Sequence, residues 1–220
     1  SKVLIFVLAI TFSLASFDMI MSLDPHWYST IFSLKNFVMA FYHGAAVITL
    51  IVILLYERGF FPALNQSHLL DFSRYIFMLS IVWGYLFFAQ FMLIWYGNIP
   101  EETAYFAVRW NDPVFKVLFF ANITLNWFIP FVLMMARRAN RSRFMVKLVC
   151  VLLIIGHYID LYDQIFPETL GAPVFGIAEA GIWLGFAGIF ILVTSWALSK
   201  APIIPRNHPY LNESLYHHVH

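Results

Sequence analysis

Long apolar runs dominate the hydrophobic pattern of this chain. A helix needs about 20 apolar residues to cross the ~30 Å hydrocarbon core of a bilayer. Six runs have about this length: Val3–Met21, Phe32–Tyr56, Tyr75–Tyr96, Val114–Ala136, Phe144–Phe166 and Val174–Leu198. No run alternates apolar and polar positions as the strands of a membrane barrel do, so helices are the spanning structure that remains. The pattern predicts an all-α, polytopic transmembrane bundle of about six helices.

The breaks between the runs are short and rich in turn residues. They lie at Asp24-Pro25, Gly59 to Pro62, Asn98 to Pro100, Asp112-Pro113, Arg137–Arg143 and Pro167 to Pro173. We therefore expect one transmembrane domain over residues 1–220, with 199–220 as a cytoplasmic tail. The first run also has features of a signal peptide, since Lys2 precedes an apolar stretch and the small residues Ser13 and Ala15. Its apolarity continues to Met21, which favours a membrane helix.

The composition of the chain excludes several classes of protein function. Hydrophobic residues make up 61% of the chain and charged residues 11%, with a mean hydropathy of +0.77, whereas a soluble domain carries roughly 25% charged residues. The net charge of +1 excludes a basic nucleic-acid-binding surface. The single cysteine, Cys150, excludes a disulfide framework and a cysteine-ligated iron–sulfur or zinc site within this chain.

Basic residues predict the orientation, because cytoplasmic loops of membrane proteins are enriched in Lys and Arg. The most basic connection is Arg137–Arg143, which we place in the cytoplasm. Six crossings then put both ends of the chain in the cytoplasm. The outer side keeps three basic residues, Lys35, Arg109 and Lys116.

Polar side chains inside the runs are the candidates for function, since a charge at the bilayer centre costs several kcal/mol and seldom faces lipid. They are Asp18, Lys35, His43, Gln90, Asn122, Asn126, His157, Asp160, Asp163, Gln164 and Glu179. In the predicted orientation the charged residues lie near the outer ends of their helices, and His43 and His157 lie near the middle. The spacing of His157, Asp160 and Gln164 places them on one helical stripe.

These residues describe a polar half-channel that runs from the midplane to the outer surface. Carboxylates and imidazoles take up and release protons at workable pKa values once burial shifts them. We predict that one set of residues forms either a proton pathway or a buried charge network: Asp18, Lys35, His43, His157, Asp160, Asp163 and Glu179.

Each candidate also has a simpler interpretation. The carboxylates Asp18, Asp163 and Glu179 are close enough to the interface to be hydrated helix ends. Lys35 would either snorkel outward or pair with Asp18. Asn122 and Asn126, spaced i, i+4, are typical of interhelical hydrogen bonding. Two histidines at similar depth, His43 and His157, would also suit the two axial ligand positions of a b-type haem.

Four segments carry a resemblance to a known family. They are Phe17–Thr30 (FDMIMSLDPHWYST), Gln90–Thr103 (QFMLIWYGNIPEET), His157–Tyr162 (HYIDLY) and Pro205–Leu215 (PRNHPYLNESL). These segments closely resemble the F subunits (ActF) of alternative complex III, a bacterial quinol oxidoreductase. The similarity extends over essentially the whole chain.

The resemblance implies an NrfD/PsrC-like subunit of about ten helices, of which this chain matches the C-terminal six, in a bacterial inner membrane. It implies no redox cofactor in this chain. Expected partners are an NrfD-like C subunit that oxidises quinol, an Fe–S subunit, a multihaem cytochrome c subunit with c-type haems, and lipids. Asp18, His157 and Asp160 carry over from the matching motifs. Asp163 stands where the family pattern is commonly apolar or aromatic, so its role is open.

Two function classes follow. In the first, the chain is a non-catalytic membrane subunit of a quinol-oxidising complex and contributes a proton pathway. In the second, it is a structural scaffold of that complex, and its polar groups hold the helices together. An independent secondary transporter is a third, less favoured alternative, because no pair of Gly/Pro-broken helices occupies corresponding halves of the chain.

Overall fold

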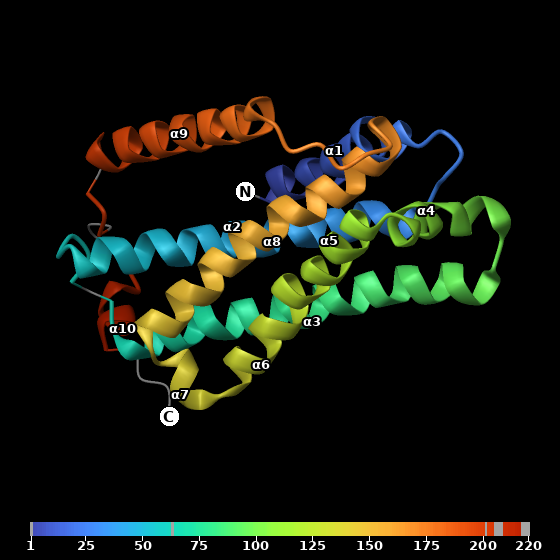
Figure 1. Cartoon of the computed structure of the whole chain (residues 1–220). Coiled ribbons are helices and arrows are strands. Elements are labelled where there is room, and N and C mark those ends of the chain that lie inside the picture. The colour runs from blue at the N-terminus through green and yellow to red at the C-terminus, as the bar shows by residue number, and fades with distance from the viewer. Residues whose placement is uncertain (1, 63, 201, 205–208, 217–220) are drawn as a thin grey trace.

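The computed structural model describes residues 2–62, 64–200, 202–204 and 209–216, and these residues contain no strand (Figure 1). One short element, η1, is a 3-10 helix, and another, η2, is a π-helix. In chain order the elements are α1 (Lys2–Met19), η1 (Met21–Leu23), α2 (Thr30–Glu57), α3 (Gln66–Gly97), α4 (Pro100–Asn111), α5 (Pro113–Ile123), η2 (Thr124–Phe128), α6 (Ile129–Met135), α7 (Arg137–Asn140), α8 (Arg143–Thr169), α9 (Ile177–Lys200) and α10 (Leu211–Leu215).

The prediction of an all-α transmembrane bundle is confirmed. Over the residues that the structure describes, six helical segments are long and apolar enough to cross a membrane, and each overlaps one predicted run. They are Lys2–Leu23, Thr30–Glu57, Gln66–Gly97, Pro113–Met135, Arg143–Thr169 and Ile177–Lys200. The predicted cytoplasmic tail at 199–220 falls partly outside the described residues.

The bundle has two unlike ends (Figure 1). The α7 end carries α7 and the basic segment Arg137–Arg143, and an ion pair joins α2 to α8 there, with 2.8 Å between Lys147 Nζ and Glu57 Oε1. The α4 end carries α4 and the connection between α1 and α2. These two ends provide the reference points for every position along the helices.

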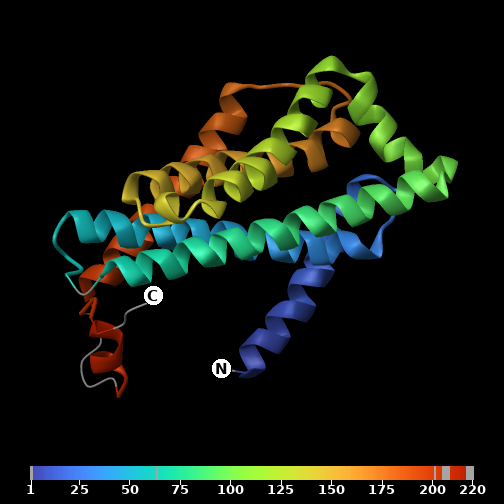
Figure 2. The same cartoon turned by 90° about the horizontal axis from the view of Figure 1, so that it is seen from below.

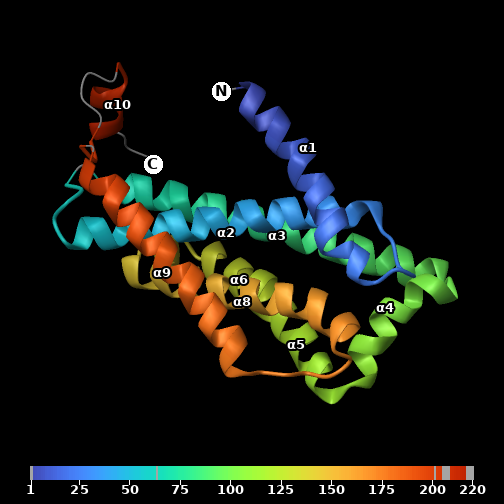
Figure 3. The same cartoon turned by 90° about the horizontal axis from the view of Figure 1, so that it is seen from above.

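Four segments pack against one another to form the bundle: α2, α3, α8 and the span α5–η2–α6. Figures 2 and 3 show α1 diverging from them, while α9 lies along the outside. In α1 only Ser16 is buried, and in α9 no residue is. The core toward the α7 end is apolar and includes Ile53, Ile76, Met134, Val146, Val149 and Leu153. Toward the α4 end polar side chains such as those of Lys35, Asn122 and Asp160 are buried beside a second, smaller apolar cluster.

Helix α4 was not predicted, because a search for apolar runs passes over a short, half-polar helix. Its sequence nevertheless follows helix chemistry. Pro100 stands at the start, where its missing N–H is not needed. Glu101 and Glu102 lie in the first turn and Arg109 in the last, in accord with the helix dipole. This helix places Arg109 against the bundle.

The predicted break from Pro167 to Pro173 overlaps the connection between α8 and α9, but this connection begins later than predicted, since α8 continues through Pro167 to Thr169. A proline has no N–H, so the carbonyl four residues earlier, that of Asp163, loses its helical donor. Arg109 Nε donates to this carbonyl at 3.0 Å. A neighbouring helix therefore supplies the missing hydrogen bond, and α8 extends beyond its proline.

Pro130 produces the same situation in the span α5–η2–α6. It removes the N–H that would donate to the carbonyl of Asn126 in an α-helix, and Asn126 lies in the π-helix. Tyr42 of α2 donates its hydroxyl to that carbonyl at 3.2 Å. Inside hydrocarbon a carbonyl without a donor costs several kcal/mol, so this contact between α2 and η2 is needed by the fold.

We predict that Tyr42→Phe lowers the free energy of unfolding by about 1–3 kcal/mol, because it leaves the Asn126 carbonyl without a donor. In a Pro130→Ala background the cost should be smaller, since residue 130 regains its N–H. Reversible unfolding in detergent micelles, followed by circular dichroism, measures both values. Tyr85→Phe is the control, because Tyr85 is exposed and its hydroxyl donates to no backbone carbonyl in the described part of the chain. Equal costs of Tyr42→Phe in both backgrounds would contradict the assignment.

Candidate functional site

Asp160 of α8 is the centre of a buried polar cluster in the α4 half of the bundle. Its side chain is 1% exposed. Its Oδ1 accepts a hydrogen bond from Asn122 Nδ2 at 2.6 Å, and its Oδ2 accepts one from Gln164 Nε2 at 2.7 Å. Both oxygens therefore have a donor, as a buried carboxylate requires. The predicted stripe on α8 joins Asp160 to Gln164 by a direct bond.

Lys35 of α2 is the cation that faces Asp160. Its Nζ lies 3.9 Å from Asp160 Oδ1, and its side chain is 3% exposed. The same Nζ lies 5.5 Å and 5.8 Å from the ring centroids of Phe32 and Phe87, within the range of cation–π attraction. Both expected roles for Lys35, snorkelling outward and pairing with Asp18, are wrong. The reason is that Asp160 is buried, and an unpaired charge costs far more there.

Asn122 and Asn126 link the span α5–η2–α6 to α8. Asn126 Nδ2 donates to Asn122 Oδ1 at 2.6 Å and to the carbonyl of Gly156 at 2.9 Å. The helices approach so closely that a Cβ at Gly156 would lie 2.5 Å from Asn126 Oδ1. The predicted interhelical hydrogen bonding by this asparagine pair is confirmed, and it depends on a glycine in α8.

His43 of α2 and His157 of α8 contact each other edge to face, with ring centroids 4.2 Å apart and an interplanar angle of 71°. Among the described residues, the buried Nδ1 atoms of both rings have no hydrogen-bond partner. Rings in direct contact leave no space for a macrocycle between them, so this pair does not fit a b-type haem. Two adjacent imidazoles instead offer neighbouring sites for one proton.

Arg109 of α4 is fully buried against α8. Besides the bond to the Asp163 carbonyl, its Nε lies 3.6 Å from Asp163 Oδ2. Its Nη1 donates to the Tyr105 carbonyl at 2.6 Å and lies 3.4 Å from Glu168 Oε1. One guanidinium thus contacts two carboxylates. Asp163 is 4% exposed, so its interpretation as a hydrated helix end is wrong, because Arg109 and α4 cover it.

Aromatic rings cover the guanidinium at this end. The Arg109 guanidinium carbon lies 3.4 Å from the ring centroid of Tyr105, and Trp27 stacks on Tyr105 with 4.0 Å between ring centroids. Burial raises the pKa of Tyr105 above its ordinary value, although Arg109 beside it acts in the opposite direction. The phenol is therefore neutral at physiological pH, and the ring serves as a cover and a cation–π partner for Arg109.

Two predicted pathway residues lie apart from this cluster. Asp18 is exposed on α1 and, among the described residues, takes part in no ion pair. Glu179 Oε2 accepts a hydrogen bond from the Gly176 N–H at 2.8 Å, at the start of α9, where a carboxylate is favoured. The structure gathers the other five predicted residues in the α4 half of the bundle: Lys35, His43, His157, Asp160 and Asp163.

The sequence interpretation missed Arg109 and Glu168, which it left in the outer connections. One signal pointed to them. Pro167 lies four residues after Asp163 and therefore predicts a carbonyl in need of a donor at the end of the helix. A buried arginine from another segment is one of the few side chains that reach such a carbonyl and nearby carboxylates together.

Along α8, ionisable residues follow one another toward the α4 end: His157, Asp160, Asp163 and Glu168. At 1.5 Å per residue the row covers roughly 16 Å, about half of the hydrocarbon thickness. In the other direction α8 buries only apolar or weakly polar side chains, those of Leu153, Cys150, Val149 and Val146. The ionisable row therefore belongs to one half of the bundle.

Several buried polar atoms around this row have no hydrogen-bond partner among the described residues. They are Gln90 Nε2, Arg109 Nη2, Asn126 Oδ1, Asp163 Oδ1 and Gln164 Oε1, in addition to the two histidine Nδ1 atoms. Buried polar atoms are normally paired with protein or with ordered water. These atoms therefore favour water molecules beside the ionisable side chains.

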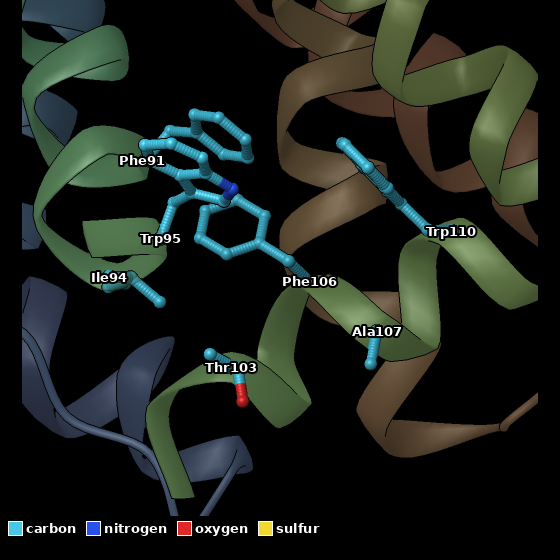
Figure 4. Close-up of a pocket in the computed structure, with 7 residues that line it drawn as sticks. All are labelled: Phe91, Ile94, Trp95, Thr103, Phe106, Ala107 and Trp110. Carbon is cyan, nitrogen blue, oxygen red and sulfur yellow. The ribbon is translucent and has the colours of Figure 1, made fainter. Parts of the chain in front are cut away.

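A separate pocket of about 130 Å³ lies between α3 and α4 (Figure 4). It is lined by Phe91, Ile94, Trp95, Thr103, Phe106, Ala107 and Trp110. Thr103 provides the one hydroxyl in this lining and donates it to the Pro100 carbonyl at 3.2 Å. The pocket holds no titratable group, so it offers no acid–base chemistry.

No protein-family model and no curated protein matches this chain. A functional proposal therefore rests on the buried cluster and on the four segments from which the sequence predicts a relation to ActF. Of these, the segment Pro205–Leu215 lies partly outside the described residues.

We predict that Lys35→Met and Asp160→Asn each destabilise the protein, with Lys35→Met costing about 3–5 kcal/mol because it leaves a buried carboxylate without its cation. The double variant should cost clearly less than the sum of the single costs. Unfolding in detergent micelles measures all four proteins. The matched control is the cycle of Lys147→Met and Glu57→Gln, which joins the same two helices at a part-exposed position and should show a coupling of about 0–1 kcal/mol. Additive costs for the first cycle would refute the Lys35–Asp160 pair.

Proposed function

We propose that this chain is an integral membrane subunit of a quinol-oxidising electron-transfer complex, related to alternative complex III, and that it contributes a proton pathway. The observation that carries the proposal is the row of ionisable groups on α8 around Asp160. It begins at the contact between His43 and His157 and ends at Glu168, whose side chain is 20% exposed.

Three features support conduction over a purely structural role. The Lys35–Asp160 pair is loose, with 3.9 Å between the charged atoms, although burying two charges costs several kcal/mol per ion. Ionisable residues in membrane helices are typical of proton relays. Unpartnered buried atoms favour water between the groups, and water passes protons where side chains do not touch.

The complex is proposed from the sequence segments that resemble ActF. In this proposal the chain holds no redox cofactor. Quinol is oxidised at an NrfD-like partner, and an Fe–S subunit and a multihaem cytochrome c subunit carry the electrons. The basic α7 end faces the bacterial cytoplasm, in accord with the distribution of Lys and Arg, and the α4 end faces the periplasm.

A structural scaffold is the second candidate, and one observation favours it. Both oxygens of Asp160 already accept hydrogen bonds from amide side chains, and Asn126 ties η2 to α8. Such a network joins helices whether or not a proton moves through it.

Asp160→Asn separates the two candidates. In the assembled complex, reconstituted in proteoliposomes, we expect it to lower the number of protons released per electron. Quinol oxidation in the presence of an uncoupler and the subunit composition should stay unchanged, because the amide preserves the size of the side chain and the partner subunits stabilise the folded chain against the loss of stability predicted above. Proton release is followed with an external pH indicator after a pulse of quinol.

Glu57→Gln is the matched control, since it removes a carboxylate from an ion pair between the same helices at the α7 end. Its proton release should equal that of the unaltered protein. Unchanged proton release in Asp160→Asn would refute conduction, and loss of partner subunits would support the scaffold. Purification without cytochrome and Fe–S partners would refute the assignment to such a complex.

A further inference from the structure

We propose that Glu168 is the group that exchanges protons with water at the α4 end, and that Arg109 is the positioning residue that holds Glu168 and Asp163 together. This inference rests on the proposed proton pathway and assigns the outer end of it. Neither residue belongs to the polar set that the sequence predicted.

The exposure of the carboxylates increases along α8. The side chain is 1% exposed at Asp160, 6% at Asp163 and 20% at Glu168. Of these three groups, only Glu168 combines contact with the interior and access to the surface. A proton that leaves the cluster along α8 therefore meets Glu168 before it meets bulk water.

Arg109 holds the two outer carboxylates at one guanidinium. Its Nε lies 3.6 Å from Asp163 Oδ2, and its Nη1 lies 3.4 Å from Glu168 Oε1. An arginine does not give up its proton in proteins, so Arg109 cannot relay one. Its contribution is geometric, because the planar fork keeps both carboxylates at fixed places.

The surroundings of Glu168 suit proton exchange. Asp24, in the connection between α1 and α2, interacts electrostatically with Glu168. Two carboxylates near the surface raise the local concentration of cations, hydronium included. On the inner side, Asp163 Oδ1 and Arg109 Nη2 are buried without partners among the described residues, and they favour a water molecule between the two carboxylates.

The proton transfer is balanced without any other reactant. A proton on the Asp160 carboxyl passes through water to the Asp163 carboxylate, then through water to the Glu168 carboxylate, and finally to bulk water. Each carboxylate is ionised again after the proton leaves. Uptake follows the reverse order, and Arg109 stays charged throughout.

The test is Glu168→Gln in the reconstituted complex. The amide oxygen still accepts from Arg109 Nη1, so the packing is retained while proton exchange is lost. We expect the initial rate of proton release to fall by about tenfold or more, as for loss of a proton-transfer group. Millimolar azide, a small weak acid, should restore the rate, because it carries protons in place of the missing carboxyl.

Glu101→Gln is the control, since Glu101 is an exposed carboxylate on α4 outside the row. Its proton release should be normal, and the same azide concentration should leave its proton gradient unchanged. Glu168→Asp keeps a carboxylate and should retain a rate between those of Glu168→Gln and the unaltered protein.

Arg109→Lys tests the positioning role. A lysine keeps the charge but lacks the fork that contacts two carboxylates, so proton release should slow and azide should restore it. Slowing without azide rescue would show that Arg109 only holds the helices together.

The outcomes separate this inference from the proposed function. If Asp160→Asn blocks proton release but Glu168→Gln does not slow it, the exchange role of Glu168 is wrong and the pathway stands. If Glu168→Gln slows release without azide rescue, Glu168 is structural. If Asp160→Asn has no effect on proton release, both the proposed pathway and this inference are wrong.

Discussion

Backbone carbonyls inside hydrocarbon must find donors within the protein, and this constraint governs the structure around the polar cluster. Pro130 and Pro167 each leave one carbonyl of a spanning helix without its helical donor. Side chains from neighbouring elements supply both missing bonds, Tyr42 at Asn126 and Arg109 at Asp163. The second bond buries a permanent cation, and the carboxylates of Asp163 and Glu168 lie around that cation. The carboxylates at the α4 end are therefore grouped around the same arginine that replaces a missing helical hydrogen bond.

The same four segments build two halves of different chemistry. Toward the α7 end they enclose an apolar core in which hydroxyl groups such as Ser73 and Thr49 bond to backbone carbonyls. Toward the α4 end they enclose carboxylates, imidazoles and amides. The apolar half stabilises the helix packing, and its core contains no carboxylate or imidazole among the described residues. A path across the whole bilayer therefore needs groups outside this core, either on the outer faces of the bundle or on another chain.

The spans and the polar stripe of α8 follow from local sequence, because length, hydropathy and helical spacing act over short distances. Interhelical bonding by Asn122 and Asn126 was also predictable, since amides in hydrocarbon seek partners. The partner of Lys35 was not, because depth alone does not distinguish Asp18 from Asp160 without the packing of α1. Helix α4 was missed for its low hydropathy, and Arg109 with it. The partner of Lys35 and the position of Arg109 depend on tertiary contacts. The sequence indicated only one of them, through a proline four residues after Asp163.

Arg109 is held by backbone as well as by charge, and this decides how the α4 end would respond to a proton in the proposed pathway. Its Nε bonds to the Asp163 carbonyl and its Nη1 to the Tyr105 carbonyl. Protonation of Asp163 weakens the ion pair but leaves both carbonyl bonds intact. The guanidinium therefore stays in place and holds Glu168, part-exposed at 3.4 Å, between the buried cluster and the surface. A fixed cation beside a part-exposed carboxylate would give the proposed exchange of protons a defined place without requiring the helices to move.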